Sequence, residues 1–325
     1  MRVLIVKTSS MGDVVHALPA VSDLAGHLPG AQIDWVVEEQ FAEIPRLHRN
    51  VVRVIPISLR RWRGQLHLAS TWRQIGDARR ALSQDRYDTI LDLQGLLKSA
   101  FLARWARGPV AGPCGRSARE RAASWFYDRR FSVDPTLHAI DRNRLLAAQV
   151  FGYQPEGTID FGIRMPKVAT AALRPWIGDK RFALLLTNAS RHSKLWPDEN
   201  WRSIEAWLAE QGLTSVLVWG TERERAATLR RAAPMHTARL APPAGLETLA
   251  AVCGRASLVI GLDTGLTHWA AAVGAPTVGI FCDYDPARVG LKVDERRVNL
   301  GGVADPPSSE DVIDAARHVL AAAAA

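Results

Sequence analysis

The feature that most constrains the fold is a regular alternation of short apolar runs with helical stretches. In the first half, apolar runs occupy residues 3–6, 33–37, 51–57 and 89–93, and helical patterns lie near 41–48, 70–84, 96–106 and 139–151. A short continuous apolar run fits a strand that is buried on both faces. Strands that alternate with helices form βαβ units. We therefore expect a parallel sheet covered by helices.

The second half repeats this alternation. Its strand candidates are residues 182–186, 215–219, 257–260 and 277–281, and its helix candidates are 199–211, 222–232, 246–253 and 265–273. The pair Pro306 and Pro307, followed by two serines, marks the start of a last helix. Residues 108–135 differ, because they combine Gly-Pro pairs with many arginines, and we expect loop and short helix there.

Length and chain punctuation together indicate two domains. A chain of 325 residues exceeds the size at which single hydrophobic cores usually stop growing. The Pro-Glu-Gly sequence at 155–157 and Pro166 interrupt the middle of the chain, where the composition also changes. We expect an α/β protein with an N-terminal domain at 1–165, a C-terminal domain at 166–307 and a C-terminal helix at 308–325.

The charge balance points to an anionic partner. The chain has 41 Lys and Arg against 33 Asp and Glu, which gives a net charge of +8. Such a surplus suits nucleic acid, an acidic membrane, or a phosphorylated or carboxylated substrate, although arginine-rich composition alone also produces it. The hydrophobic share of 47% and the charged share of 23% are ordinary for a globular protein. No apolar run approaches the roughly 18 residues that a membrane span needs.

The cysteines and histidines predict no metal site. Cys114, Cys253 and Cys282 are widely spaced and odd in number, which favours reduced thiols in the cytosol. The nine histidines are scattered without the spacing of metal ligands. The apolar part of the first residues is too short for a secretory signal. We therefore expect a cytoplasmic protein.

Residues 259–268, with the sequence VIGLDTGLTH, read as a buried strand, a tight turn and a helix. The first free amides of such a helix, with the positive end of its dipole, can seat a phosphate. Thr264 and His268 are four residues apart and share a helix face, Gly265 lets a ligand approach the backbone, and Asp263 ends the strand beside them. The alternative is structural: a capping Thr, a turn Gly and a His satisfied by its neighbours.

Two further turns in the second half point to the same kind of ligand. The turn after 182–186 supplies hydroxyls and cations, including Ser190 and Lys194, and the turn after 215–219 supplies Glu222 and Glu224. A phosphate is held by amides and cations, whereas a carboxylate holds a ribose diol well. Together the three turns predict a sugar-nucleotide site at the carboxyl ends of the strands.

Several common nucleotide and hydrolase motifs are missing from the sequence. No G-x-G-x-x-G follows the first strand, which disfavours a dinucleotide-binding domain, and no G-x-x-x-x-G-K-[ST] loop marks a P-loop NTPase. No G-x-S-x-G elbow marks a serine hydrolase. These absences leave a sugar-nucleotide enzyme as the best fit.

The turn after the first strand carries a second candidate residue. Ser10 and Asp13 have the spacing of a capping box, with Asp in place of the usual Glu. The functional alternative is a carboxylate at the carboxyl end of the first strand. Sequence spacing leaves both interpretations open.

Basic residues are concentrated in the first half. Arg60, Arg61 and Arg63 surround Trp62, and Lys98 follows a Gln-Gly turn. Between 104 and 130 seven arginines face only Glu120 and Asp128, and Trp105 and Trp125 lie among them: Arg104, Arg107, Arg116, Arg119, Arg121, Arg129 and Arg130. Arginine pairs bidentately with carboxylates and phosphates, and Trp suits a membrane interface. A solvated arginine surface over buried tryptophans is the alternative.

At this point the motifs resemble a known family. Residues 7–20 (KTSSMGDVVHALPA), 193–197 (SKLWP), 219–222 (WGTE) and 263–268 (DTGLTH) are similar in order and spacing to the ADP-heptose-dependent lipopolysaccharide heptosyltransferases of glycosyltransferase family 9. The similarity extends over nearly the whole chain. The K-T-S-S-M-G-D opening resembles the enzymes that add the first heptose more than those that add the second.

The resemblance implies a GT-B architecture, in which two Rossmann-like domains with parallel sheets face each other across a cleft. The N-terminal domain would bind the acceptor, the C-terminal domain would bind ADP-heptose, and the last helix often crosses back to the first domain. The implied reaction is inverting transfer of L-glycero-D-manno-heptose from ADP-heptose to the Kdo region of Kdo-lipid A. It implies action at the anionic cytoplasmic face of the inner membrane, as a peripheral protein, with no cofactor, metal or nucleic acid.

The resemblance also assigns site residues. Asp13 matches the catalytic base. Donor-binding positions match Ala189, Ser190, Lys194, Glu224, Asp263, Thr264, Gly265 and His268. The concentration of cations in the first half, and not the resemblance, leads us to expect acceptor binding at Arg60, Arg61, Arg63, Lys98 and Arg121. Ala189 departs from the family, which usually has a hydroxyl residue there, and this puts one donor hydrogen bond in question. Whether Glu222 or Glu224 contacts the ribose stays open.

Three alternative functions compete with this interpretation. Another family 9 enzyme would add the second heptose. A non-catalytic nucleotide-binding or nucleic-acid-binding protein would explain the charge and would bind RNA or DNA in a salt-sensitive way. A sugar-nucleotide epimerase would need NAD and its glycine fingerprint. Neither the binding protein nor the epimerase explains Asp13 together with residues 263–265.

Overall fold

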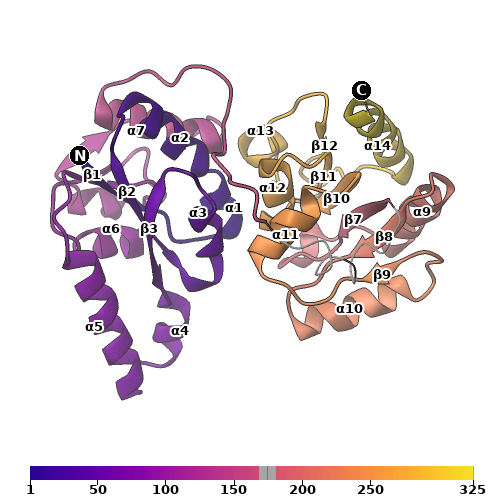
Figure 1. Ribbon diagram of the computed structural model, residues 1–325, viewed down its shortest axis with the longest axis horizontal. Helices are drawn as coiled ribbons and strands as arrows, with labels where there is room; N and C mark the ends of the chain where they lie inside the picture. The colour runs from indigo at the N-terminus through magenta and orange to yellow at the C-terminus, as the bar shows by residue number, and fades with distance from the viewer. Residues whose placement is uncertain (168–173, 175–180, 325) are drawn as a thin grey trace. The chain divides into compact units, whose positions relative to one another are not determined.

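The computed structural model of the chain describes residues 1–167, 174 and 181–324. The chain divides into two compact units, Met1–Arg164 and Met165–Ala325, and each has its own six-stranded parallel sheet (Figure 1). Both sheets are sandwiched between helices. We call these parts unit 1 and unit 2.

The sheet of unit 1 has the strand order β3-β2-β1-β4-β5-β6, and all its pairings are parallel. Val3, Leu4, Ile5 and Val6 of the central strand are almost fully buried, as their apolar run predicts. The strands are β1 (Arg2–Val6), β2 (Gln32–Glu38), β3 (Val51–Ile57), β4 (Thr89–Asp92), β5 (Val110–Pro113) and β6 (Arg129–Phe131).

The helices of unit 1 include the predicted 139–151 segment, which is α7. Figure 1 shows α7 beside α2, and the two are in contact. The helices are α1 (Met11–Val15), α2 (Leu18–His27), α3 (Glu43–Arg46), α4 (Leu59–Gly64), α5 (Ala69–Ser83), α6 (Leu97–Ala103) and α7 (Ala139–Phe151), with 3₁₀ turns η1 (Glu39–Phe41) and η2 (Arg121–Phe126).

The expectation of only loop and short helix at 108–135 is wrong. The segment contains the short helix η2, but it also adds β5 and β6 to the sheet. β5 is only four residues long, and β6 is an edge strand whose two arginines are exposed. Neither strand has a long enough apolar pattern to be seen in the sequence.

Unit 2 has the strand order β12-β11-β10-β7-β8-β9, again wholly parallel. The strands are β7 (Phe182–Leu186), β8 (Thr214–Leu217), β9 (Arg239–Leu240), β10 (Leu258–Leu262), β11 (Thr277–Phe281) and β12 (Arg297–Gly301). The sequence did not predict β9, which has two residues, or β12, which is mostly half-buried and partly polar.

The helices of unit 2 match the four predicted stretches closely. They are η3 (His192–Lys194, a 3₁₀ turn), α9 (Asp198–Glu210), α10 (Glu222–Ala232), α11 (Leu246–Cys253), α12 (Gly265–Ala272), α13 (Pro286–Val289) and α14 (Ser309–Ala324). The last helix, α14, buries Val312, Ala316 and Val319 in the core of unit 2, against α9 and the sheet.

Both sheets have the same doubly wound topology. Numbered from the first strand of each unit, both read 3-2-1-4-5-6, the order of dinucleotide-binding folds. The direction of winding reverses between β1 and β4 in unit 1 and between β7 and β10 in unit 2. Ligands of open α/β sheets bind outside the carboxyl ends of the strands at such switch points. The predicted α/β fold with two Rossmann-like sheets is confirmed.

Candidate active site

At the switch point of unit 2, three side chains from two neighbouring strand ends meet. Lys194 lies in the turn after β7, and its Nζ donates to Asp263 Oδ2 at 2.5 Å and to the Asp263 carbonyl at 3.1 Å. Asp263 directly follows β10, and its other oxygen lies 3.3 Å from His268 Nε2. The ammonium of Lys194 also sits 4.7 Å from the ring centre of Tyr284.

This cluster is mostly buried and strongly polarised. Burial would raise the pKa of Asp263, but the hydrogen bonds and charges of His268 and Lys194 lower it below its ordinary value. The side chain of Asp263 is 8% exposed and that of Lys194 is 17% exposed. A fixed carboxylate therefore orients a cation that still reaches solvent, as a site for an anion requires.

The start of α12 lies in the same turn. Thr264 is its N-cap residue with an extended backbone, and Gly265 is its first helical residue. Thr267 Oγ1 donates to the Leu262 carbonyl at 2.5 Å. A Cβ added at Gly261 would lie 2.4 Å from the hydroxyl oxygen of Thr267, so no larger residue fits there. The β10–α12 turn is thus held tightly, with the first amides of the helix beside Lys194 and Asp263.

The other predicted donor residues lie at neighbouring strand ends. β8, β7 and β10 are adjacent, so the turns that follow them meet at one edge of the sheet. Ser190 is exposed, and Ala189 packs partly against the core. Glu224 completes a capping box, because its Oε2 accepts from the amides of Gly220 and Thr221 at 2.9 Å.

Glu222 and Glu224 differ in their surroundings. The side chain of Glu222 is 80% exposed and pairs with Arg225 at 3.6 Å. Glu224 is half-buried and uses one oxygen for the backbone, which leaves its other oxygen available to a ligand. Glu224 is therefore the better oriented of the two carboxylates.

In unit 1, Asp13 lies in α1, directly after the turn that follows β1. Its Oδ2 accepts from the Ser10 amide at 3.0 Å and from the Ser10 hydroxyl at 3.1 Å. Arg119 pairs with it in a fork, with Nη2 to Oδ1 at 2.5 Å and Nη1 to Oδ2 at 3.2 Å. The capping contact predicted from Ser10 and Asp13 is present. The carboxylate also has a charged partner that the sequence did not identify.

The carboxylate of Asp13 stays ionised. Burial would raise its pKa, but the charges of Lys7 and Arg119 and the hydrogen bonds from Arg119 and Ser10 hold the pKa far below the usual range. Its side chain is 15% exposed, whereas that of Arg119 is 43% exposed. The partner that holds Asp13 is thus itself open to solvent.

Lys7 is the buried cation of this site. It is 4% exposed, and its Nζ donates to the Leu93 carbonyl at 2.7 Å and to Asn143 at 3.4 Å. Burial lowers its pKa to about 8, with Asp13 opposing the shift. Lys7, Asp13, Gln94, Arg119 and Asn143 line a cavity of about 50 Å³.

A hydrogen-bond network fixes the turns after β1 and β4 to each other. Gln94 Oε1 accepts from the amide and hydroxyl of Thr8, both at 2.7 Å, and its Nε2 donates to the Ser9 carbonyl. The buried carboxylate of Asp92 accepts from the Gln94 amide and from the Tyr127 hydroxyl. The backbone around Asp13 is therefore held from the neighbouring strand.

One of the predicted acceptor-binding residues, Lys98, lies near Asp13, and a second, Arg60, lies near Lys98. Lys98 Nζ donates to Ser9 Oγ at 2.9 Å, and its pKa is lowered by burial and by Arg60, while Glu38 and Asp13 oppose the shift. Glu38 ends β2 and is 3% exposed. Burial raises its pKa, and the Arg60 amide and the Lys98 charge oppose that shift. Glu38 thus accepts a hydrogen bond from the start of α4 and also interacts electrostatically with Lys98.

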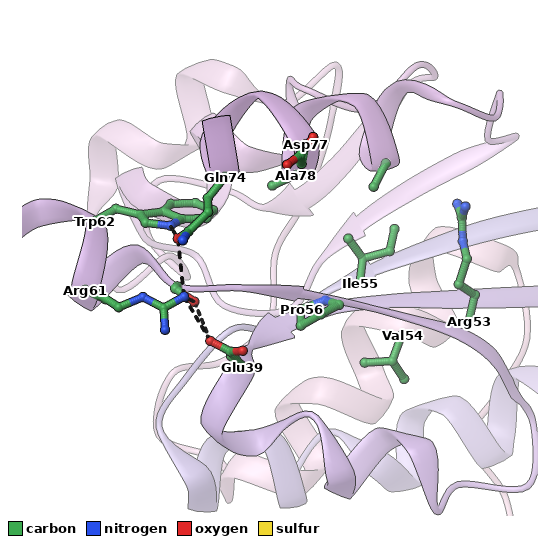
Figure 2. Close-up of a pocket in the computed structure, with 12 residues that line it drawn as sticks. Glu39, Arg53, Val54, Ile55, Pro56, Arg61, Trp62, Gln74, Asp77 and Ala78 are labelled. Carbon is green, nitrogen blue, oxygen red and sulfur yellow. Dashed lines mark hydrogen bonds and ion pairs between the residues drawn. The ribbon is translucent and has the colours of Figure 1, made fainter. Parts of the chain in front are cut away.

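The other acceptor-binding residues are spread more widely. Figure 2 shows Arg61 at a pocket of about 360 Å³ between β3, α4 and α5, where it pairs with Glu39 at 3.2 Å. Beside it, the buried Trp62 donates to Gln74 at 2.9 Å. Arg63 and Arg121 are exposed. The five residues do not form one cluster: Lys98 is electrostatically coupled to Asp13, and Arg60 is coupled to Lys98.

Sequence reasoning missed several residues of these sites. Lys7, Gln94 and Glu38 each follow or end a strand, so the strand-end rule used for the second half would have found them. Arg119 was only one of many arginines, and Tyr284 had no motif around it. Within the described ranges, no group of three His, Cys, Asp or Glu side chains is placed to hold a metal ion. A helix long and apolar enough to cross a membrane is likewise missing from the described part of the chain.

Comparisons with known proteins identify the family and the fold of the chain. The sequence model of glycosyltransferase family 9 (heptosyltransferase) matches residues 75–311. Lipopolysaccharide heptosyltransferase 1 of Pseudomonas aeruginosa is 41% identical over 306 residues, which cover 93% of this chain and 84% of the relative. The structure of E. coli heptosyltransferase WaaC with ADP is 37% identical, with a TM-score of 0.87 over 97% of this chain and 98% of that one. The structure of the same enzyme with ADP-2-deoxy-2-fluoro heptose is 36% identical to this chain, with a TM-score of 0.83 over 97% of this chain and 98% of that one.

Proposed function

The chain belongs to glycosyltransferase family 9, the heptosyltransferases, and we propose the substrates and residues with which it transfers heptose in lipopolysaccharide inner-core synthesis. The donor is ADP-heptose, in line with the ADP and ADP-heptose analogue in the titles of the WaaC structures. The acceptor is the Kdo region of Kdo-lipid A, and L-glycero-D-manno-heptose is transferred with inversion. The observation that carries the proposal is the Lys194–Asp263–His268 cluster beside the start of α12.

The donor diphosphate binds at this cluster. Lys194 and the first amides of α12 stabilise the negative charge that develops on the leaving ADP. Asp263 and His268 hold the lysine in position, and Ser190 and Thr264 add hydroxyls at the same edge of the sheet. The free oxygen of Glu224 accepts from the ribose diol. Ala189 contributes no hydrogen bond, so the donor is held by one contact fewer than in relatives with a hydroxyl there.

Asp13 acts as the general base. An inverting transfer needs one carboxylate to take the proton from the acceptor hydroxyl while ADP leaves from the opposite face of the sugar. Asp13 is ionised and partly exposed, as this role requires, but its pairing with Arg119 makes it a weak base. An acceptor carboxylate that pairs with Arg119 releases Asp13, so that basicity rises when the acceptor is bound.

The acceptor is a charged lipid, and its anionic groups bind to the basic residues of unit 1. Lys98 contributes next to Asp13, Arg60 contributes beside Lys98, and Arg61, Arg63 and Arg121 contribute at longer range. Because the acceptor lipid resides in a membrane, the protein works as a peripheral protein at the cytoplasmic face of the inner membrane. The anionic lipids of that face also suit the net charge of +8.

A transfer assay tests this proposal directly. Purified protein is incubated with ADP-heptose and Kdo-lipid A, released ADP is measured, and the anomeric configuration of the product is determined by NMR. We expect ADP release that depends on the acceptor and a product of inverted configuration. Acceptor already carrying one heptose should be a poor substrate. Efficient use of that acceptor would assign the addition of the second heptose, and no ADP release together with RNA binding would favour a non-catalytic role.

A further inference from the structure

The α4–α5 hairpin of unit 1 is built as a projection with a packed base. α4 and α5 extend together away from the sheet and are joined at their far end by residues 65–68 (Figure 1). At the base, Trp62 is 5% exposed and belongs to the core, and its indole N–H is bound by Gln74. The hairpin therefore has a fixed position relative to its sheet before any partner arrives.

The far end of the hairpin exposes large apolar side chains. Leu66 is 49% exposed, Leu68 is 39% exposed and Trp72 is 59% exposed. They belong to one small turn, because the Trp72 indole N–H donates to the Leu66 carbonyl at 2.8 Å and the Thr71 amide donates to the Leu68 carbonyl. We call Leu66, Leu68 and Trp72 the hairpin tip.

The hydrogen bond of Trp72 makes this surface suited to an apolar medium. A tryptophan that enters a low-dielectric environment must have its N–H satisfied, because an unpaired donor there is strongly unfavourable. In the hairpin tip the backbone already satisfies it. The ring can thus leave water without losing a hydrogen bond, which a solvent-facing role would not require.

The positive charge around the hairpin tip indicates the chemistry of the partner that it binds. From Leu59 to Gly76 the sequence contains Arg60, Arg61, Arg63 and Arg73 and no Asp or Glu. Apolar and aromatic side chains surrounded by arginines are typical of segments that lie in the interface of an anionic bilayer. The same stretch carries arginines assigned above to the lipid acceptor, so acceptor capture and membrane contact would occur on one hairpin.

We propose that the hairpin tip inserts into the interface of an anionic lipid bilayer and holds unit 1 on the membrane that contains the acceptor. The choice of a bilayer rests on the proposed function, because a lipid acceptor gives the hairpin a membrane to meet. The tip itself makes no contact with the acceptor sugar. Substitution of the tip side chains should therefore weaken membrane binding and leave catalysis on a soluble acceptor unchanged.

Flotation with vesicles containing anionic phospholipid, and no acceptor, tests the proposal. The test variant is Leu66→Ser with Trp72→Ser. The control is Trp125→Ser, which removes a more exposed tryptophan, at 76%, from η2 beside Arg121. We expect wild type and the control to bind, and the tip variant to bind about tenfold more weakly or less, because buried apolar area drives insertion. All three should bind poorly to purely zwitterionic vesicles.

Transfer assays on the same proteins keep this test distinct from that of the proposed function. With a Kdo acceptor that lacks acyl chains, the tip variant should retain the turnover of wild type, and with acceptor embedded in vesicles its rate should fall with its vesicle binding. Trp72→Phe, which keeps an aromatic ring, should restore most binding if the double variant proves unstable. Equal vesicle binding by wild type and the tip variant, no binding by wild type, or an equal loss in Trp125→Ser would overturn the proposal. A protein inactive on every acceptor would instead contradict the proposed function.

Discussion

The switch points of the two units have the same strand order but present opposite charges to a ligand. In unit 2 the carboxylate of Asp263 is the more buried partner, at 8% exposure, and the cation of Lys194 faces outward at 17%. In unit 1 the most buried cation, Lys7, lies beneath Asp13, whose partner Arg119 is 43% exposed. One site presents a cation held by a buried carboxylate, and the other presents a carboxylate whose arginine partner is open to solvent.

This contrast shows that the fold supplies the location of a site but not its chemistry. The guanidinium of Arg119 is open to solvent, whereas Asp13 is mostly buried and its charge is also balanced by Lys7. In the proposed function, a ligand carboxylate pairs with Arg119 while Lys7 still balances the charge of Asp13. Lys194 and Asp263 are less exposed and also bound to His268 and Tyr284, so a ligand adds to this cluster instead of dismantling it.

The largest expected effect is on catalysis at unit 1. Asp13→Asn keeps the size and much of the capping ability of Asp13 but removes its basicity, and turnover should fall by about 10²–10⁴. Lost capping alone costs only about 1 kcal/mol of stability. Steady-state rates and melting temperatures separate the two effects. Asp128→Asn, which alters another arginine-paired carboxylate of unit 1, is the matched control. Near-normal turnover of Asp13→Asn would leave Asp13 as a helix cap.

A smaller effect is expected at unit 2. Lys194→Ala removes one charge-assisted contact to the diphosphate, worth roughly 1.5–3 kcal/mol, so the KM for ADP-heptose should rise by about tenfold or more. Lys194→Arg retains the charge, so its KM for ADP-heptose should lie between that of Lys194→Ala and that of wild type. An unchanged KM for the donor in Lys194→Ala would show that the cluster is structural, and the contrast between the two units would fail.

The acceptor residues should respond to salt. Reversing charge at Arg60, Arg61 and Arg63 should raise the KM for the acceptor and spare the KM for the donor, because these cations are all in unit 1. The effect should weaken with added salt, since exposed charges are screened over about 8 Å at physiological ionic strength. Reversal of three exposed arginines of unit 2, Arg202, Arg230 and Arg317, is the control. If both triple variants raised the KM for the acceptor equally, Arg60, Arg61 and Arg63 would act only through the overall surface charge and not as an acceptor site.

The smallest effect concerns the pH dependence of stability. The pKa of Lys7 is lowered from 10.5 to about 8, so between these values the folded protein binds fewer protons at Lys7 than the unfolded chain does. The contribution of Lys7 to the free energy of unfolding should therefore increase as the pH rises above about 8. Below pH 8 Lys7 is charged in both states, and the folded protein is destabilised by the full cost of burying that charge. Denaturant titrations of wild type and Lys7→Met across this range would reveal it. Identical slopes would mean that Lys7 is not perturbed by burial.

The elements that sequence predicted are those with strong local patterns. β1, β7, α7 and α10 follow their apolar runs or helical periods almost to the residue. β5, β6, β9 and β12 are short or partly polar, and the last three are edge strands, so their pairing depends on the sheet already formed. Their existence is set by tertiary contacts, which a local pattern does not contain.

The same distinction applies to the sites. Asp263, Thr264, Gly265 and His268 lie in one continuous motif, so the sequence could indicate their proximity. Arg119 reaches Asp13 from 106 positions away, and Glu38 meets Lys98 only because β2, β1 and β4 are neighbours. The position of a residue next to a strand end could be predicted from the sequence, but its charged partner could not.

The division of labour between the two switch points is tested most directly by calorimetric titration of ADP into wild type, Asp13→Asn and Lys194→Ala. If unit 2 holds the nucleotide and unit 1 supplies the base, Asp13→Asn binds ADP with the Kd of wild type while Lys194→Ala binds it about tenfold more weakly or worse. Weakened binding in Asp13→Asn with unchanged binding in Lys194→Ala would contradict the account.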